Sequence, residues 1–189
     1  MQINNKQDYH DFLKADLKAL NISPNLKNKL FHDIWKFQKT LRKLEYFINC
    51  KHSPLAKIYA LYLQLKLRAQ GRNLGFSIPP NTFGPGLSIA HAGTIVVNAN
   101  AKIGSNCRIH VCVNIGADIS DGKKAPSIGD NCYIGPGVKA YGDIEIGDNV
   151  GIGANAVVNK CYGSNLTIAG VPAKIISRVG PLNYRDMSK

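Results

Sequence analysis

The stretch that decides the fold is Ile128-Gly-Asp-Asn-Cys-Tyr-Ile134-Gly-Pro-Gly-Val-Lys-Ala140-Tyr-Gly-Asp-Ile-Glu-Ile146-Gly-Asp-Asn-Val-Gly-Ile152-Gly-Ala-Asn-Ala-Val-Val158. A small or branched aliphatic residue recurs at every sixth position, and glycine follows each isoleucine of the series. A helix would need gaps of three and four, and a half-buried strand would alternate every second residue. The sustained period of six therefore indicates a repeat architecture.

The repeat extends toward the N-terminus through Val97, Ile103, Ile109 and Ile115, preceded by the phase-shifted series Phe83, Ile89 and Ile95. A unit of six suits a triangular coil, in which a short strand forms each face and one aliphatic side chain points inward. Tight corners need residues that tolerate unusual backbone angles, and Gly, Asn and Asp do. The expected corners are Ser105-Asn106, Asp130-Asn131, Asp148-Asn149 and Ala154-Asn155. Three units make one turn, which predicts about five turns of a parallel β-helix.

The first 75 residues follow a helical pattern instead, and only Gly71 and Gly75 of the 18 glycines lie there. Residues 8–20 predict a short helix, and Ser53-Pro54 predicts the N-cap and first residue of another that Gly71 and Gly75 close. Between them, gaps of three and four separate the apolar residues Leu30, Ile34, Phe37, Leu41, Leu44 and Ile48, which predicts a helix of about six turns. We therefore expect an α-helical region (1–75), a β-solenoid domain (76–170) and a C-terminal tail (171–189).

Composition excludes several classes of protein. The chain has 189 residues, of which 44% are hydrophobic and 19% charged, so it can form a sizeable core. Its longest apolar run, residues 58–63, is far shorter than the roughly 20 residues of a membrane span, and we expect no transmembrane helix. The N-terminus lacks the apolar core of a secretory signal, and the five cysteines include no C-x-x-C pair. The expected location is the cytoplasm.

The net charge of +12 is concentrated in the helical region, where residues 1–75 hold 14 basic and 5 acidic side chains. The simplest interpretation is a helical cap that packs on the coils or on a second subunit. Docking of the basic face on a membrane, at its inner side, is an alternative. A non-enzymatic basic binding module is a remote alternative, and because no nucleic-acid motif is present we expect no nucleic-acid partner.

Over residues 76–176 the chain resembles the hexapeptide-repeat acyltransferases, whose fold is a left-handed parallel β-helix, and among them the serine acetyltransferase type. The stretches that carry the resemblance are Ile89-Ala-His-Ala-Gly-Thr-Ile-Val-Val97, Ile115-Gly-Ala and Ala125-Pro-Ser-Ile128-Gly, Ile134-Gly-Pro-Gly-Val138, Ile152-Gly-Ala-Asn-Ala-Val-Val158 and Ala169-Gly-Val-Pro-Ala-Lys174. The resemblance implies a left-handed coil and an O-acetyltransferase activity.

It further implies acetyl-CoA as co-substrate and His91 as the general base, a role that suits histidine because its pKa lies near working pH. The matching donor-binding positions are Gly116, Pro136, Ala154 and Ala169, with Lys174 near the CoA phosphates. The family forms trimers, some of which pair, with active sites between subunits, so His91 is expected to meet groups of a neighbouring chain. Zinc-binding relatives of this fold use three histidines, whereas the predicted coils contain only His91 and His110, so a metal site is not expected.

The match fails at the residues that would hold an amino acid. Serine-specific members carry an Asp before the catalytic His, where this chain has Ala90, and an Arg-His pair where it has Lys124-Ala125. They also carry an upstream carboxylate that orients the base, and its nearest counterpart here is Ser77, with a difference of one residue in length. The gap between Ile115 and Ile128 is thirteen residues rather than twelve, which predicts a polar loop over residues 118–124.

The acceptor therefore stays open between two hydroxyl compounds. Because the charge partners are missing, we expect a sugar hydroxyl of a capsular or lipopolysaccharide glycan, with Ser77, His110 and Lys124 as acceptor contacts. The alternative is L-serine, converted to O-acetylserine for cysteine synthesis.

Overall fold

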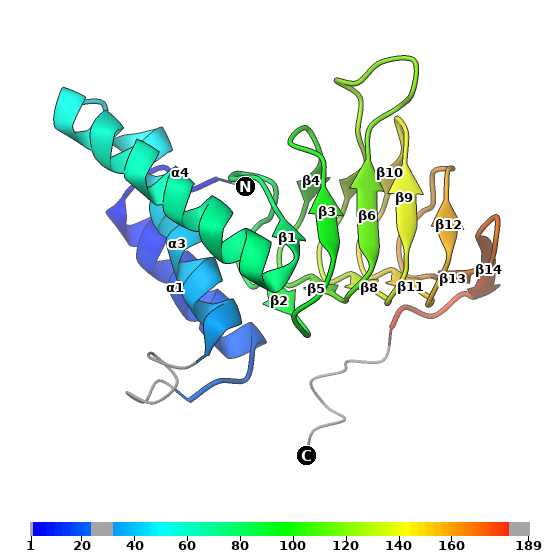
Figure 1. Cartoon of the computed structure of the whole chain (residues 1–189). Coiled ribbons are helices and arrows are strands. Elements are labelled where there is room, and N and C mark those ends of the chain that lie inside the picture. Colours follow the sequence, from blue (N-terminus) through cyan, green and yellow to red (C-terminus); the bar gives the residue numbers. More distant parts are fainter. Residues whose placement is uncertain (1, 24–31, 182–189) are drawn as a thin grey trace.

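The computed structural model describes residues 2–23 and 32–181, which form a set of packed helices and a parallel β-helix (Figure 1). In the described part the helices are α1 (Lys6–Ala19), α3 (Asp33–Cys50) and α4 (Pro54–Leu74). Leu30, which we expected to begin the middle helix, lies outside the described residues. None of the described helices is long and apolar enough to cross a bilayer.

The helix ends follow from the sequence. The Asn5 side chain accepts a hydrogen bond from the backbone N–H of Asp8 and caps α1, and Ser53 caps α4 by accepting from Ala56. Pro54 opens α4, and Gly75 closes it in the left-handed conformation with φ of 81°. Gly71, by contrast, lies inside α4, where a Cβ would come within 2.5 Å of the carbonyl oxygen of Phe76.

The strands make three sheets among the described residues, one for each face of the coil. In chain order, sheet A contains β1 (Phe76–Ser77), β3 (Ile95–Val97), β6 (Val113–Gly116), β9 (Lys139–Tyr141) and β12 (Val157–Val158). Sheet B contains β4 (Lys102–Ile103), β7 (Ser127–Ile128) and β10 (Glu145–Ile146), and sheet C contains β2 (Ser88–Ile89), β5 (Arg108–Ile109), β8 (Tyr133–Ile134), β11 (Gly151–Ile152), β13 (Thr167–Ala169) and β14 (Lys174–Ser177).

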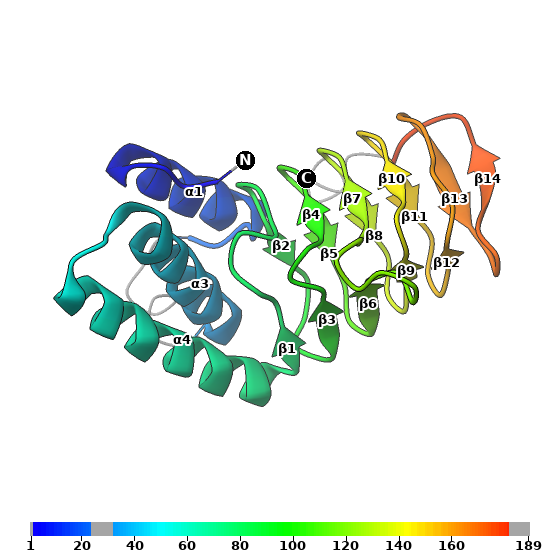
Figure 2. The same ribbon diagram turned by 90° about the horizontal axis from the view of Figure 1, so that it is seen from above.

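The coils stack as the period of six predicts. Ile89, Ile109, Ile134, Ile152 and Ile168 pair in register along sheet C, and each is at most 1% exposed. Asn106, Asn131, Asn149 and Asn155 all take positive φ of 55–57°, so the expected corner residues do adopt the left-handed conformation. Figure 2 shows the coils side by side, with the helices against the first coil.

The interruption of the repeat is larger than expected. Ile103 pairs with Ile128, which follows it by 25 residues, whereas Ile128 pairs with Ile146, 18 residues later. Ile115 and Ile128 therefore lie on adjacent faces of the coil, one repeat unit apart. The loop adds seven residues to that single six-residue unit, whereas we expected one extra residue over two units. The backbone N–H of Asp118 donates to the carbonyl of Lys124 at 2.8 Å, which brings the ends of the loop together.

A buried ion cluster joins the helices to the first coil. Arg42 of α3 is fully buried and donates to both carboxylate oxygens of Asp16 (2.8 and 3.2 Å), to Glu45 (3.0 Å) and to the carbonyls of Phe83 and Gly84. Asp16 in turn accepts from two backbone N–H groups of the coil, those of residues 86 and 87. Burial alone would lower the pKa of Arg42, but Asp16 and Glu45 outweigh burial and raise it.

The far end of the solenoid is closed by β14. It pairs antiparallel with β13, joining Ile175 to Ile168 and Lys174 to Ala169, whereas the strand pairs of the coils are parallel. Residues 174–177 therefore form a strand within the segment that we expected to be a tail.

Candidate active site

His91 lies at the corner between sheets C and A. β2 ends at Ile89, and the backbone N–H of Ala90 still bonds to the carbonyl of Ile109 at 3.0 Å. Two residues after His91, the N–H of Gly93 bonds to the carbonyl of Leu74 at 2.8 Å. The backbone is thus held on both sides, while the His91 side chain is exposed.

The register of sheet C places several of the predicted site residues along one corner of the β-helix, between sheets C and A. Because the five isoleucines of sheet C pair in line, the positions one and two residues after them are also in line. These positions include the predicted residues His91, His110, Pro136, Ala154 and Ala169, and Lys174 joins them by pairing with Ala169. We call this row of six residues the His91 edge. The row contains two histidines, the small residues Pro136, Ala154 and Ala169, and at one end Lys174.

His110 is the half-buried neighbour of His91 on this edge, and their ring centroids are 6.4 Å apart. Its Nε2 accepts from Nε of Arg108 at 3.3 Å, and its ring also contacts Tyr133 at 4.9 Å between centroids. Burial lowers the pKa of His110 to about 4, with further lowering by Arg108 and His91. His110 is therefore neutral at pH 7 and uses one ring nitrogen as an acceptor.

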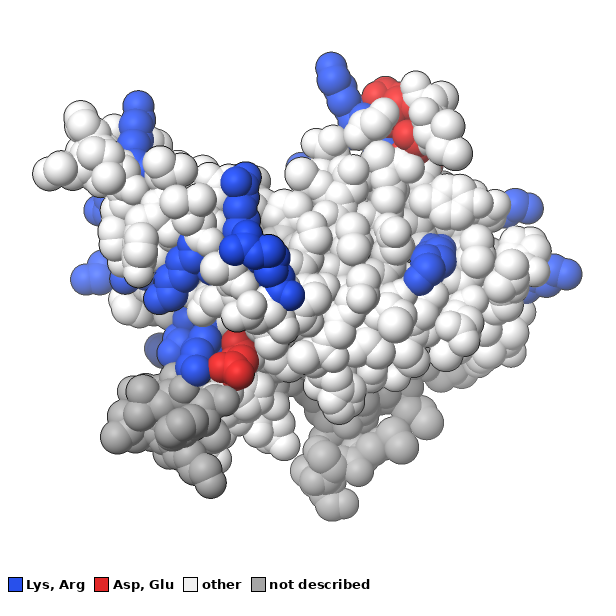
Figure 3. Space-filling model, in the orientation of Figure 1, with Lys and Arg blue, Asp and Glu red and all other residues white. Residues whose placement is uncertain are grey.

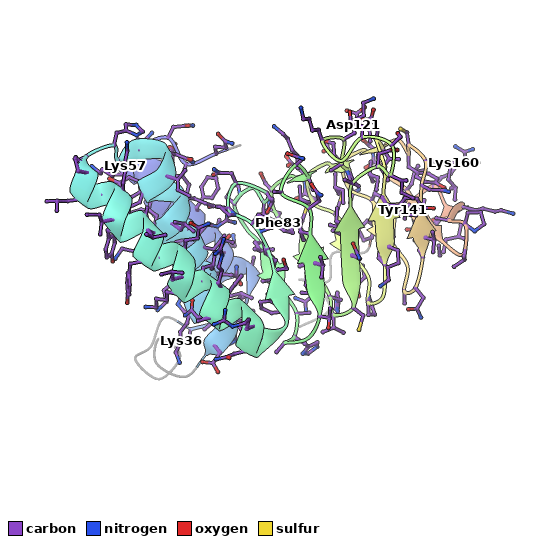
Figure 4. All side chains as sticks on the ribbon, turned by 45° about the horizontal axis from the view of Figure 1, so that its top comes forward. Lys36, Lys57, Phe83, Asp121, Tyr141 and Lys160 are labelled. Carbon is purple, nitrogen blue, oxygen red and sulfur yellow. The ribbon has the colours of Figure 1, made fainter. Side chains whose placement is uncertain are left out.

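Gly116 and Lys124 do not lie on the His91 edge. Gly116 ends β6, at the corner between sheets A and B, where the loop leaves the coil. Figure 4 shows Asp121 in this loop, standing away from the coils. Lys124 pairs with Asp143 at 2.8 Å on the exposed surface, and this hydrogen bond raises the pKa of Lys124. Within one chain, sheet A separates these two residues from His91.

Ser77 lines a hollow between α4 and the first coil. The hollow has a volume of about 580 Å³, and Arg68, Arg72 and Phe76 line it with Ser77. Our sequence analysis did not select Arg68 or Arg72, nor Arg108 beside His110. The sequence could have indicated Arg108, because it precedes the inward-facing Ile109 in the strand. Successive side chains of a strand alternate, so Arg108 points outward beside His110.

Two kinds of partner for His91 are not found among residues 2–23 and 32–181. No ion pair there joins His91 to a carboxylate. No group of three His, Cys, Asp or Glu in these ranges could hold a metal ion.

Comparisons with known proteins show what the chain is similar to. The family described as "Bacterial transferase hexapeptide (six repeats)" matches residues 125–160. The serine acetyltransferase of Buchnera aphidicola is 32% identical over 188 residues, 97% of this chain and 64% of that protein. The serine acetyltransferase of Synechococcus elongatus is 35% identical over 119 residues, 60% of this chain and 49% of its own. This chain thus spans less than two thirds of these curated relatives.

Among solved structures, the complex of Brucella abortus serine acetyltransferase with coenzyme A superposes with a TM-score of 0.76, at 28% identity, over 94% of this chain and 71% of that one. The chain thus has the left-handed β-helix fold that the period of six and the motifs predict, and residues 125–160 match the hexapeptide-repeat transferase family. The chain is similar to serine acetyltransferases.

Proposed function

We propose that this protein is an acetyl-CoA-dependent O-acetyltransferase with His91 as general base. The observation that carries the proposal is the His91 edge, on which an exposed histidine is in register with small residues across successive coils. The similarity to serine acetyltransferases, including one solved with coenzyme A, supports acetyl-CoA as the donor.

The proposed reaction is a direct acyl transfer. The imidazole of His91 accepts the proton of the acceptor hydroxyl as that oxygen attacks the thioester carbonyl. The C–S bond then breaks, the acetyl group stays on the acceptor oxygen, and the CoA thiolate takes up the proton. Backbone N–H groups near the thioester carbonyl are the proposed donors to the developing oxyanion, a contribution commonly worth about 3 kcal/mol for one good donor. Lys174 is the proposed contact for the CoA phosphates.

The comparisons favour L-serine as the acceptor over the sugar that we expected from the sequence, because the similar proteins described above are serine acetyltransferases. A sugar hydroxyl remains the second candidate, since Ser77 and Ala90 occupy positions where serine-specific members carry carboxylates and Lys124-Ala125 replaces Arg-His. Without those carboxylates, the site lacks the charge partners that an amino acid's ammonium group would use. Thiol release from acetyl-CoA distinguishes the two: saturable turnover with L-serine rejects the sugar, and turnover with oligosaccharides alone rejects serine.

His91→Ala tests the base directly. We expect kcat with the better acceptor to fall by about 10²- to 10⁴-fold, the range typical of a lost general base. His52→Ala is the matched control, because His52 is an exposed histidine of the helical region. Melting temperature and oligomeric state should stay unchanged in both variants. Retained turnover in His91→Ala would remove His91 from this role.

We also propose that the protein assembles as a homotrimer, or a pair of trimers, with the active site shared between subunits. The support is the separation of the loop and Lys124 from His91 within one chain. A neighbouring subunit can bring its own loop and Lys124 to the His91 edge.

A further inference from the structure

The outer face of α4 carries a stripe of exposed apolar side chains. Leu55 is 80% exposed, Ile58 66%, Leu61 57%, Tyr62 53% and Leu65 55%. Each lies three or four residues from another member of the set, so together they line one side of the helix. The opposite side of α4 packs on the rest of the protein through the buried residues Ala56, Leu63, Leu67 and Gly71. The stripe, which we call the α4 stripe, is therefore separate from the core.

The position of the α4 stripe leaves the coils accessible. α4 begins at its end farthest from the β-helix (Figure 1), and its C-terminal part lies against the first coil, where Gly71 approaches Phe76. Lys57, near that far end, is labelled in Figure 4. Single exposed apolar residues are ordinary on protein surfaces, but a contiguous row indicates a contact surface.

Basic side chains flank the α4 stripe on both sides. At 100° per residue, Lys66 falls beyond one margin of the stripe, and Lys57 and Arg68 fall beyond the other. α4 contains no Asp or Glu. Figure 3 shows that most of the Lys and Arg visible on this face of the molecule lie over the helices, while the surface of the strands is largely uncharged.

We propose that the α4 stripe docks on an anionic lipid bilayer, with α4 lying in the plane of the interface. Apolar side chains would enter the acyl boundary, while the flanking lysines and arginine contact lipid phosphates, as in interfacial amphipathic helices. A second copy of the chain fits less well. Pairing of two stripes would set Lys57, Lys66 and Arg68 of one copy near those of the other, and α4 has no acidic residue to offset them.

The test is flotation of the full chain with vesicles of phosphatidylcholine, with and without phosphatidylglycerol. We expect the protein to float only with the anionic vesicles and to dissociate as salt is raised. Leu61→Ser/Leu65→Ser should weaken this binding at least about tenfold. The matched control is Ile119→Ser, since Ile119 is 99% exposed but lies in the loop after β6. Its binding should equal that of the wild type.

A charge variant tests the contribution of the basic flanking residues separately from that of the α4 stripe. Lys57→Gln/Lys66→Gln should weaken binding to anionic vesicles and flatten its salt dependence, whereas the control Lys102→Gln/Lys160→Gln, on exposed coil positions, should not. Absence of wild-type flotation, or equal flotation of all variants, overturns the proposal. Loss of oligomer in Leu61→Ser/Leu65→Ser by light scattering, with no vesicle binding, overturns it in favour of a second copy. Helix content by circular dichroism should be unchanged throughout.

Discussion

At the scale of single residues, His110 shows how burial and two neighbouring groups set a protonation state. Burial lowers its pKa to about 4, with further lowering by Arg108, from which its ring accepts a hydrogen bond, and by His91. In an unfolded chain a histidine titrates near pH 6.5. Between these two values the unfolded state binds more protons than the native state, so stability falls as pH falls from 6.5 to 4.

His110→Gln should remove this part of the pH dependence. We expect the free energy of unfolding of the wild type to drop by about 1 kcal/mol more than that of the variant between pH 7 and pH 4, because solvent reaches the half-buried ring and weakens the repulsion. Urea unfolding at a series of pH values measures it. Parallel curves for the two proteins would show that His110 titrates normally in the native state.

Arg42 provides the contrasting case of a buried charge. Arg42→Ala would leave Asp16 and Glu45 buried without their cation, and we expect a loss of about 3–5 kcal/mol in the free energy of unfolding. Lys36→Ala removes an exposed partner of Asp33 on the same helix and should cost less than about 1 kcal/mol. Urea unfolding measures the free energy of unfolding of both variants. Equal losses in the two would mean that the buried cluster does not hold the helices to the coil.

At the scale of elements, the loop after β6 is an addition to a complete coil. Residues 118–124 are the seven that exceed the period, and their ends are already joined by the bond from Asp118 to Lys124. Deleting residues 118–124 should therefore leave the melting temperature within a few degrees of the wild type. Thiol release should fall, because the deletion removes Lys124 and the surface proposed to complete the site. A large fall in melting temperature would mean that the loop supports the coil.

The sequence predicted the elements where one side chain decides the local structure. Asn131 and Asn149 set corners, Ser53 and Pro54 begin a helix, and each sixth residue fills the core. It did not predict the polar packing. The buried role of Arg42 was not predicted, because its partners Asp16 and Glu45 and the carbonyl of Phe83 converge only in the folded chain.

The loop length shows the same limit. The spacing of thirteen residues between Ile115 and Ile128 does not show which face of the coil each occupies. The pairing of Ile128 with Ile103 shows that Ile128 lies on sheet B. Motif similarity located His91, but which of the selected residues share its edge depends on the register of sheet C. For the same reason Gly116 was grouped with residues from which sheet A separates it.

At the scale of the whole molecule, the proposed sharing of each active site between subunits can be tested by mixing two variants in one assembly. His91→Ala retains the loop, and the chain lacking residues 118–124 retains His91. If each site takes His91 from one subunit and the loop from the next, co-assembly of these two weak variants should restore about a quarter of the sites by random assortment in a trimer. Thiol release after co-expression measures it, and activity no greater than the sum of the separate variants would place each site within one subunit.

The antiparallel strand β14 has a consequence for solubility. Every parallel coil offers its unpaired backbone groups to the next, so an uncovered last coil would accept the first coil of any other solenoid, and molecules could join end to end into filaments. β14 runs against the direction of the stack and occupies the open side of β13, while the helices occupy the other end. On sheet C, a further parallel coil would thus meet a strand of reversed direction, which opposes growth of the stack on that face.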